Sequence, residues 1–419
     1  MTVYGVNEGY VVYLIWAAMN ETKTRHILVS GASIAGPAIA YWLNRYGLKV
    51  TVVERSPALR GGGYPIDLRG SAVEVAKKMG IYPALQEAHI RTRRMRFMDD
   101  DGHAFATLDP EAITGSEESD VEIPRADLAS LLYGLTRDDV EYRFNDSIDA
   151  IEDTDGGAHI TFQSGQRGTY DAVIGADGLH SNTRRIVFGS EEPFLRYMGY
   201  TFVGCTVPPM DGLQEEIASY FAENRLATLY AVRNVERLFA FFVLRRPYPE
   251  GEDMRDHSAQ CRLMREAFAQ DGWLVASLLS ALDDADDVFC DTVAQIHMPR
   301  WSKGRVALVG DAAYGPSFMT GQGSSLALVG AYMLAGELAS NPDPHVAFAR
   351  YEELTRPFVE ANQAGVTPNA WPMIPNSKEE VEKRRRAFAQ AMHRHEPDDK
   401  EKAKRERRNS LKLPTYPRS

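Results

Sequence analysis

The chain has 419 residues, of which 44% are hydrophobic and 25% are charged, and its formal net charge is −11. This length exceeds what one hydrophobic core usually serves, roughly 250–300 residues, and therefore predicts two domains. The negative charge argues against polyanionic partners, so we expect no binding to nucleic acid.

The cysteines and the first apolar run argue against disulfide-rich, metal-binding and membrane-spanning proteins. Cys205, Cys261 and Cys290 lack metal-ligand spacing, so we expect no disulfide framework and no metal site, and a reducing cytoplasm fits best. The apolar run Val11–Met19 is shorter than the roughly 20 residues of a membrane helix, so no membrane span is expected. Because a globular domain could begin after Met19, residues 1–18 are interpreted as an upstream extension of the reading frame.

The first chemical signal is a strand, a glycine-rich turn and a helix. His26–Ser30 is typical of a buried strand, and Gly31-Ala32-Ser33-Ile34-Ala35-Gly36 is typical of a turn that opens a helix. Small residues there let backbone N–H groups approach a pyrophosphate at the positive end of the helix dipole. A second strand, Lys49–Val53, ends at Glu54, which is placed to accept hydrogen bonds from ribose hydroxyls. This unit predicts dinucleotide binding, with FAD and NAD both open.

Two later motifs narrow the choice of cofactor. Asp171–Gly178 is an apolar strand that runs into the acidic turn of a D-G-x-x-S-x-x-R motif. Arg305–Ala313 is another buried strand, which ends in Gly-Asp before Gly321-Gln322-Gly323 and a helical stretch over Ser324–Leu338. A carboxylate at a strand end accepts hydrogen bonds from a polyol, and a glycine-rich helix start supplies N–H groups to a partly negative ring oxygen. Flavin offers both features.

Taken together and in this order, the motifs resemble those of the para-hydroxybenzoate-hydroxylase-type (group A), single-component flavin monooxygenases. The resemblance covers most of Arg25–Leu338. Gly63–Gly70 and Ser324–Leu338 are most similar to a branch that includes tetracycline-inactivating monooxygenases, so antibiotic modification is one expected role. Tyr314 and Phe318 depart from the family, which usually has His and Pro at these positions.

The resemblance implies FAD bound without a covalent bond. Arg55 would lie near the isoalloxazine, Asp311 would bind the ribityl chain, and Asp177 belongs to a motif linked to both FAD and the pyridine nucleotide. The expected cofactor-binding residues are Gly31, Ser33, Gly36, Glu54, Arg55, Asp67, Arg125, Asp177, Gly178, Gly310, Asp311, Gly321, Gln322 and Gly323.

The spacing of the motifs predicts an α/β fold in which a Rossmann-like FAD-binding domain is assembled from residues 22–95, 121–195 and 291–365. Residues 196–290, with 96–120, would form a substrate-binding domain built on a mainly antiparallel β-sheet, and residues 366–419 a C-terminal helix and charged tail. Within the second domain, Met198–Pro208 and Ala227–Arg246 are predicted strands, the latter turning at Asn234–Glu236, and His257–Leu282 is a predicted helix. The candidates for the substrate site are five aromatic residues: Phe202, Tyr230, Phe239, Phe241 and Phe318. Aromatic side chains on half-buried strands more often belong to the core.

We therefore expect a monooxygenase in which NADH or NADPH reduces FAD, and O₂ forms a flavin C4a-hydroperoxide that oxygenates a small aromatic or polyketide-like molecule. The flavin would carry the chemistry, so no catalytic side chain is assigned. Arg60 is the candidate contact for NAD(P)H, and His180 is expected to be a surface loop residue. An FAD-dependent reductase or halogenase, and a flavoprotein that sequesters a metabolite, are the alternatives, and a monomer and a homodimer are both compatible with the sequence.

Overall fold

The computed structural model describes residues 24–59, 61, 64–111, 117–210, 212–231, 238–254, 256–392 and 399–416. The candidate nicotinamide contact Arg60, the predicted turn Asn234–Glu236 and residues 1–18 lie outside this part of the chain.

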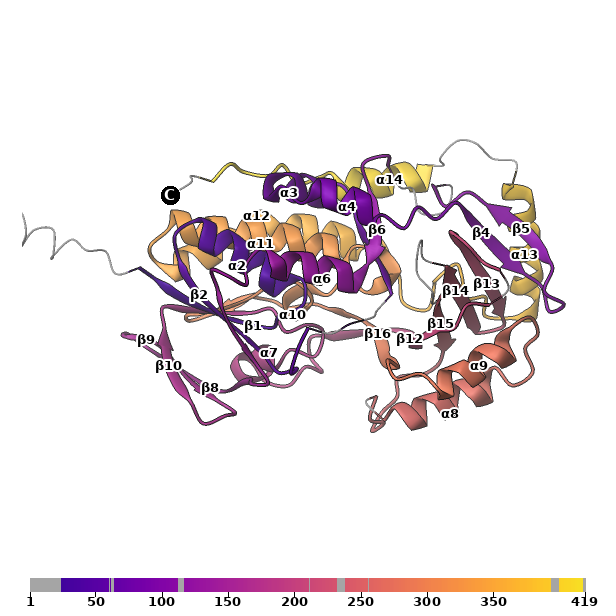
Figure 1. Cartoon of the computed structure of the whole chain (residues 1–419), viewed down its shortest axis with the longest axis horizontal. Coiled ribbons are helices and arrows are strands. Elements are labelled where there is room, and N and C mark those ends of the chain that lie inside the picture. Colours follow the sequence, from indigo (N-terminus) through magenta and orange to yellow (C-terminus); the bar gives the residue numbers. More distant parts are fainter. Residues whose placement is uncertain are drawn as a thin grey trace, which may run out of the picture.

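A six-stranded sheet forms one half of the molecule (Figure 1), in the order β17–β18–β11–β1–β2–β7. Its strands are β17 (Ser302–Lys303), β18 (Val306–Leu308), β11 (Ala172–Gly175), β1 (His26–Ser30), β2 (Lys49–Glu54) and β7 (Glu141–Phe144). All neighbours are parallel except β17 and β18. The inner strands β11 and β18 are buried along their whole length, and β1 and β2 are buried over all but their ends, because helices and a small sheet cover both faces.

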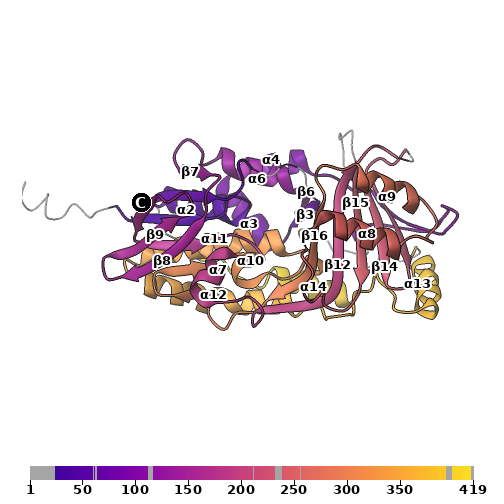
Figure 2. The same ribbon diagram turned by 90° about the horizontal axis from the view of Figure 1, so that it is seen from below.

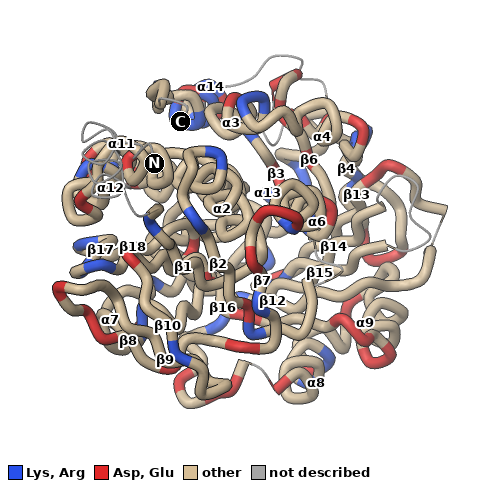
Figure 3. The backbone as a smooth tube through the Cα atoms, turned by 60° about the vertical axis from the view of Figure 1, so that its left-hand side comes forward, with Lys and Arg blue, Asp and Glu red and all other residues tan. Residues whose placement is uncertain are grey.

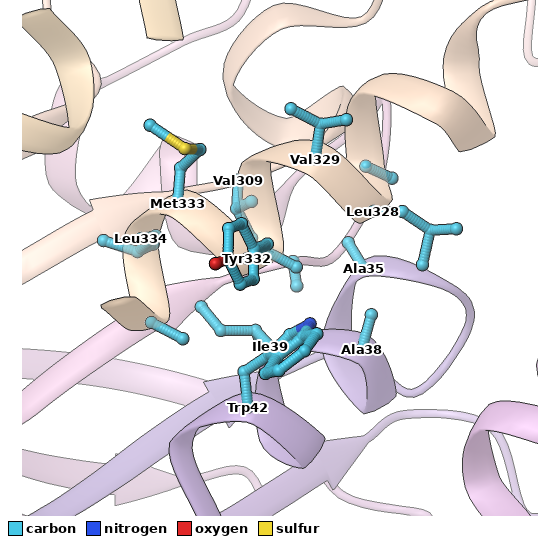
Figure 4. Packing of buried hydrophobic residues seen from close by; sticks show 14 of the residues in the cluster. Ala35, Ala38, Ile39, Trp42, Val309, Leu328, Val329, Tyr332, Met333 and Leu334 are labelled. Atoms are coloured by element: carbon cyan, nitrogen blue, oxygen red, sulfur yellow. The ribbon is translucent and has the colours of Figure 1, made fainter. Parts of the chain in front are cut away.

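Two helices from distant parts of the chain pack together on one face of this sheet. They are α2 (Ala35–Arg45) and α11 (Gly323–Ser340), and α12 (Pro344–Gln363) lies beside α11. Figure 4 shows Ile39 and Trp42 of α2 against Tyr332 of α11, with Val309 from the end of β18 behind them. Residues Ser325–Leu338 of α11 are all buried, which explains why its sequence is apolar on every side. The predicted strand His26–Ser30 is confirmed, and Lys49–Val53 and Ser324–Leu338 differ from β2 and α11 only at their ends.

A seven-stranded sheet forms the other half (Figure 2), in the order β16–β12–β15–β14–β13–β4–β5. Its strands are β16 (Phe289–Ile296), β12 (Leu195–Val207), β15 (Leu238–Arg245), β14 (Arg225–Ala231), β13 (Glu216–Ala222), β4 (Arg94–Met98) and β5 (Ala104–Leu108). Neighbours are antiparallel except β13 and β4. The mixed α/β fold class predicted from the sequence is confirmed.

Two details of this sheet differ from the sequence-based prediction. The strand β13 and the β4–β5 hairpin had not been predicted, and they extend the sheet beyond β14. The predicted helix His257–Leu282 is interrupted, and forms α8 (His257–Ala267) and α9 (Val275–Asp283). The break follows from Gly272 and Trp273: a side chain at Gly272 would collide with the Asp100 carbonyl, and Trp273 has a positive φ of 52°. Both helices pack on one face of the sheet, against Val203 and Phe242, whereas Phe202 and Phe241 lie on the opposite face.

Two smaller sheets and several short helices complete the fold. A two-stranded sheet joins β3 (Pro65–Leu68) to β6 (Val121–Pro124), and a three-stranded sheet of β8 (Ile148–Thr154), β9 (Gly157–Phe162) and β10 (Arg167–Tyr170) covers the second face of the six-stranded sheet. The remaining short helices are α3 (Ser71–Met79), α4 (Tyr82–Ala88), α6 (Arg125–Gly134), α7 (Asn182–Phe188), α10 (Asp311–Tyr314) and the 3-10 turn η1 (Phe318–Thr320).

The last described part of the chain spans both halves. Helix α13 (Lys378–Ala391) packs on β5 and β13, and α14 (Asp399–Arg408) packs on α12 and reaches the start of α3, where Ser71 donates a hydrogen bond to the Arg408 carbonyl (Figure 1). Figure 3 marks the Lys and Arg positions along α14 in blue. The segment that follows α14 is anchored at Tyr416, which is buried against Tyr332 and Tyr46 and donates a hydrogen bond to Glu337 Oε1 at 2.9 Å. In the described part of the chain, the helices lack the combined length and apolar character of a membrane span.

Candidate functional site

The glycine-rich turn after β1 is closed by two contacts that leave no room for a side chain. Gly31 has a φ of 107°, and a Cβ there would lie 2.5 Å from the Ala176 carbonyl oxygen at the end of β11. A Cβ on Gly36 would overlap the Gly31 carbonyl oxygen. The turn is therefore held against the neighbouring strand end. Helix α2 has no side-chain cap at its N-terminus, so its first N–H groups can bind an anion.

Glu54 supports this turn. Its Oε2 accepts a hydrogen bond from the Ala32 N–H at 2.8 Å, and its Oε1 accepts one from the Ser56 N–H at 2.9 Å. Each carboxylate oxygen has a second lone pair, so Glu54 can still accept hydrogen bonds from ribose hydroxyls. Arg55, the next residue, is exposed, and its assigned contact near the isoalloxazine stays a prediction.

Ser33 takes the place of the usual second glycine and is bound by an arginine from another element. Arg125, the first residue of α6, donates a hydrogen bond from Nη2 to Ser33 Oγ at 2.6 Å. The backbone N–H of Arg125 also donates to the Tyr64 carbonyl at 3.3 Å. A guanidinium group therefore lies beside the turn where a pyrophosphate would carry its negative charge.

Asp177 is engaged within the protein. Its carboxylate accepts hydrogen bonds from the Thr183 N–H and hydroxyl, both at 2.8 Å, and from the Ser181 hydroxyl. Ser181 in turn caps α7 by accepting from the Arg184 N–H at 2.9 Å. The D-G-x-x-S-x-x-R motif thus builds the turn from β11 into α7, with Gly178 at a φ of 83°. A direct contact of Asp177 or Gly178 with a nucleotide stays a prediction.

The end of β18 brings Asp311 next to the glycine-rich turn and the start of α2. Gly310 has a φ of 66°, and a Cβ there would lie 3.2 Å from Ala35 Cβ of α2. Asp311 is exposed, yet burial raises its pKa, while Arg125 and Arg184 lower it. Asp311 therefore lies in a recess, where solvent reaches its carboxyl group although protein atoms surround it. A Cβ on Gly323 would lie 3.9 Å from Asp311 Oδ1, so the start of α11 closes the recess on that side.

The start of α11 offers unused hydrogen-bonding groups. Gln322 is its N-cap and provides no side-chain cap, so the first N–H groups of the helix have no such partner. The Gln322 side chain is 2% exposed and donates to the Gly321 carbonyl at 3.1 Å, whereas its Oε1 is buried without a hydrogen-bond partner among the described residues. Gly321 has a φ of 63°, and a Cβ there would lie 2.9 Å from Asp67 Oδ2. These groups fit the pyrimidine edge of a flavin, which carries both donors and acceptors.

Aromatic side chains from the seven-stranded sheet and the neighbouring loops form one cluster. Four of the five predicted substrate candidates belong to it: Phe202 and Phe318 lie 5.1 Å apart, Phe241 and Phe318 5.3 Å, and Phe239 and Phe241 6.4 Å between ring centroids. Tyr230 is adjacent, because it pairs with Phe239 across β14 and β15.

The cluster has three further members that the sequence analysis missed. Phe289 stacks on Tyr64 at 5.5 Å and lies 5.6 Å from Phe202, and Trp371 lies 5.4 Å from Phe318. Gly204 makes room for two of these rings, because a Cβ there would lie 2.8 Å from both Phe239 and Phe289. Alternation along β16 could have indicated Phe289, but Tyr64 and Trp371 lie in irregular segments without such a signal. Tyr314, in contrast, is buried away from this cluster and bonds to the Tyr351 hydroxyl at 2.9 Å.

Glu122 and Tyr230 are polar residues at the border of the aromatic cluster. Glu122 of β6 lies directly opposite Asp67 of β3, and its pKa is raised to about 7 by burial and by Asp67, against the lowering effect of Arg69. The pKa of Tyr230 is raised by burial and by the nearby Glu122 and Asp67. Neither the position of Glu122 nor its altered acidity has a signal in the sequence.

His180 is an exposed loop residue, as predicted, but it makes two ion pairs. Its Nδ1 lies 2.8 Å from Glu191 Oε1 and its Nε2 lies 3.0 Å from Asp291 Oδ1. These carboxylates raise the pKa of His180 to about 10, so the imidazole is charged at neutral pH. It connects the turn after β11 to β16 and is thus a structural link between the two sheets. Within the part of the chain that the structure describes, no group of His, Cys, Asp and Glu side chains is arranged to hold a metal ion.

Comparisons with known proteins agree with this geometry. A family described as "FAD binding domain" matches residues 24–363. A flavin-dependent monooxygenase from an unknown prokaryotic organism is 42% identical over 341 residues, which are 81% of this chain and 88% of the relative. An uncharacterised protein of Mycobacterium tuberculosis is 43% identical over 363 residues, 85% of this chain and 96% of its own length. The crystal structure of the tetracycline destructase Tet(55) superimposes with a TM-score of 0.79 at 38% identity, and covers 94% of this chain and 99% of its own.

Proposed function

The chain belongs to the FAD binding domain family and is a relative of flavin-dependent monooxygenases, and from this we propose that it uses NADH or NADPH and O₂ to oxygenate a small aromatic or polyketide-like molecule. FAD is bound without a covalent bond along the turns after β1, β11 and β18. The flavin supplies the activation of O₂, and the protein supplies binding, orientation and a dry site.

One observation carries the proposal: the glycine-rich turn, Asp311 and the start of α11 lie in one continuous row that ends at the aromatic cluster. Gly31 is packed on the end of β11, Gly310 on the start of α2, and Gly323 beside Asp311. Such a row matches an elongated dinucleotide with a pyrophosphate at one end, a polyol in the middle and a planar ring at the other.

Each part of the row has its own task. Arg125 neutralises charge near the pyrophosphate, and Asp311 accepts hydrogen bonds from the ribityl hydroxyls. Gln322 and the N–H groups of α11 hold the ring edge and stabilise negative charge that develops there. The aromatic cluster excludes water from the side of the ring where substrate is oxygenated.

The proposed substrate class is based on the aromatic side chains of the cluster and on the similarity to a tetracycline destructase. Rings are recognised by flat apolar surfaces, and the cluster provides these through Phe202, Phe241, Phe289 and Phe318. A tetracycline destructase shares the fold over nearly the whole chain. We therefore propose polycyclic aromatic molecules, including tetracyclines, as the first substrates to test, with antibiotic modification as one biological role.

The test begins with the purified protein, which should be yellow and release FAD on denaturation. Phenolic polyketides and tetracyclines are then supplied with NADH or NADPH, and products are examined by mass spectrometry for the gain of one oxygen atom. Consumption of NAD(P)H and O₂ should match product formation. A reductase or halogenase would consume NAD(P)H without adding oxygen to the organic product, and a sequestering flavoprotein would bind ligand without turnover.

A matched pair of variants separates cofactor loss from general damage. Asp311→Ala should be folded but depleted of FAD and inactive, whereas Asp399→Ala, at the start of α14, should keep both FAD and activity. Well-folded, colourless wild-type protein that takes up no added flavin would contradict the proposal.

A further inference from the structure

The small sheet of β3 and β6 places two carboxyl groups side by side. Asp67 and Glu122 are direct partners in its antiparallel register, and the flanking residues Ile66 and Ile123 pair in the same way. Ile66 and Ile123 are buried in the core that underlies α2 and α11. Because side chains alternate along a strand, Asp67 and Glu122 both lie on the opposite face of this small sheet.

That opposite face looks toward the aromatic cluster. Asp67 Oδ2 lies near Gly321, and the charges of Asp67 and Glu122 both act on Tyr230 of β14. Tyr230 is the cross-strand partner of Phe239, whose ring stacks on Phe289 with centroids 5.9 Å apart. The two carboxyl groups and the Tyr230 hydroxyl therefore form a polar end to an otherwise aromatic surface.

The two carboxyl groups have different partners. Asp67 is bound by the Arg69 guanidinium at 2.7 Å. Glu122 Oε2 accepts a hydrogen bond from the Thr92 hydroxyl at 3.0 Å. Since the Arg69 guanidinium binds the Asp67 carboxylate directly, Glu122 is the better placed of the two to bind a polar group of another molecule.

We propose that Glu122 sets the substrate class of this site, which accepts ring systems carrying a hydroxyl or amino group and rejects those carrying a carboxylate. The inference rests on the proposed function, because it takes the aromatic cluster as the substrate wall. A hydroxyl or amino group donates a hydrogen bond to Glu122 and lies beside the Tyr230 hydroxyl. A carboxylate at the same place meets the like charge of Glu122, whereas the charge of Asp67 is already balanced by Arg69.

The rejection of carboxylates should depend on pH. The groups that face Glu122 are Asp67, Arg69 and Tyr230, and the His89 ring contacts its backbone. Burial and the neighbouring carboxylates raise the pKa of Tyr230, so it stays a neutral hydroxyl. Since the pKa of Glu122 is about 7, a second negative charge appears beside Asp67 as the pH rises through neutrality.

Two probes of equal ring size test this directly. 2-Naphthol and 2-naphthoate are titrated into the FAD-loaded protein at pH 6 and pH 8, and binding is followed by the fluorescence of the probes. We expect 2-naphthol to bind more tightly by about tenfold at pH 8, with a smaller difference at pH 6, because like charges in a desolvated site repel. Equal binding of the two probes at both pH values, or no binding of 2-naphthol, overturns the inference.

Variants identify the group responsible. Glu122→Gln should remove the pH dependence and reduce the discrimination at pH 8 by about fivefold or more, since the second charge is then absent. Tyr230→Phe should keep the pH dependence, because Glu122 remains. Glu118→Gln, a change of an exposed glutamate, should behave as wild type. Discrimination that is unchanged in Glu122→Gln contradicts the assignment even if the wild-type protein is selective.

Failure of this inference differs from failure of the proposed function. The absorbance of bound FAD is recorded in every sample. Yellow protein that hydroxylates an aromatic compound but does not discriminate between the probes refutes only the role of Glu122. Colourless protein that takes up no flavin refutes the monooxygenase assignment and removes the premise of this one.

Discussion

The Arg125 guanidinium donates a hydrogen bond to the Ser33 hydroxyl at 2.6 Å, and so links the start of α6 to the glycine-rich turn before α2. A serine at this position adds a hydroxymethyl group where the pattern favours glycine. The structure shows that the hydroxyl has a partner, and that the partner is a cation. The pair therefore presents both a positive charge and an orienting hydroxyl at the expected pyrophosphate position.

Removal of the arginine should weaken cofactor binding. Arg125→Met is expected to lower FAD affinity by about tenfold or more, because hydrogen bonds to charged groups contribute about 1.5–3 kcal/mol. Ser33→Gly should have a smaller effect, since Arg125 remains. Affinity is measured by the quenching of FAD fluorescence on titration with apoprotein. Arg137→Met, which alters an exposed arginine, is the control, and an equal loss in both arginine variants would argue against a specific contact.

The close packing of the turn predicts contrasting results for two glycines. Gly36→Ala should destabilise the protein by at least about 1–3 kcal/mol, since its methyl group overlaps the Gly31 carbonyl in a site that cannot relax easily. Gly134→Ala, at the last residue of α6 with open space around it, should be neutral or stabilise by up to about 1 kcal/mol. Urea unfolding followed by circular dichroism compares the two. Similar free energies of unfolding for both variants would contradict the packing described for Gly36.

The His180 ion pairs predict a pH-dependent contribution to stability. The pKa of His180 is raised in the folded protein from 6.5 to about 10, so its contribution is fully present below pH 6.5 and is lost as the pH rises toward 10. His180→Gln should therefore lower the melting temperature most at pH 6 and least near pH 10. His103→Gln, whose side chain is 81% exposed, is the control. A melting-temperature difference between wild type and His180→Gln that does not change between these pH values would refute the ion-pair account.

Tyr416 predicts that the segment after α14 stabilises the six-stranded half. Tyr416→Phe should cost about 1–3 kcal/mol, because the buried Glu337 Oε1 loses its hydrogen-bond donor. Tyr416→Ala should cost about 3–5 kcal/mol, since the aromatic packing on Tyr332 is lost as well. Denaturant titration provides both values. Tyr248→Phe, at a tyrosine that is 47% exposed, should change little, and a Tyr416→Ala variant as stable as wild type would contradict this contact.

The sequence predicted those parts of the fold that are specified locally. The strand β1, the turn, α2 and β2 follow one another within residues 26–54, and each has its own pattern of apolar residues and glycines. The buried helix α11 was equally clear, because an uninterrupted apolar stretch follows Gly321-Gln322-Gly323. The cofactor residues were predicted from motifs that lie at the ends of β1, β11 and β18, and their contacts with FAD stay predictions.

The remaining features depend on contacts between distant segments. β13 pairs in parallel with β4, more than 110 residues earlier in the chain, and nothing in either short segment indicates the other. The break between α8 and α9 depends on the Asp100 carbonyl, which approaches Gly272 from a separate hairpin. Glu122 and Trp371 likewise join the site only through tertiary packing, so neither the altered acidity of the first nor the ring contact of the second could be inferred beforehand.

The order of strands in the six-stranded sheet also bears on how the protein is made. β11 lies between β1 and β18 in the sheet, although the three strands come from residues 172–175, 26–30 and 306–308. On a ribosome, the N-terminal strands must wait for about three-quarters of the chain to be made before their last parallel partner, β18, arrives, and such long-range pairing is slow. Nascent chains should therefore need protection from aggregation until translation has passed this point.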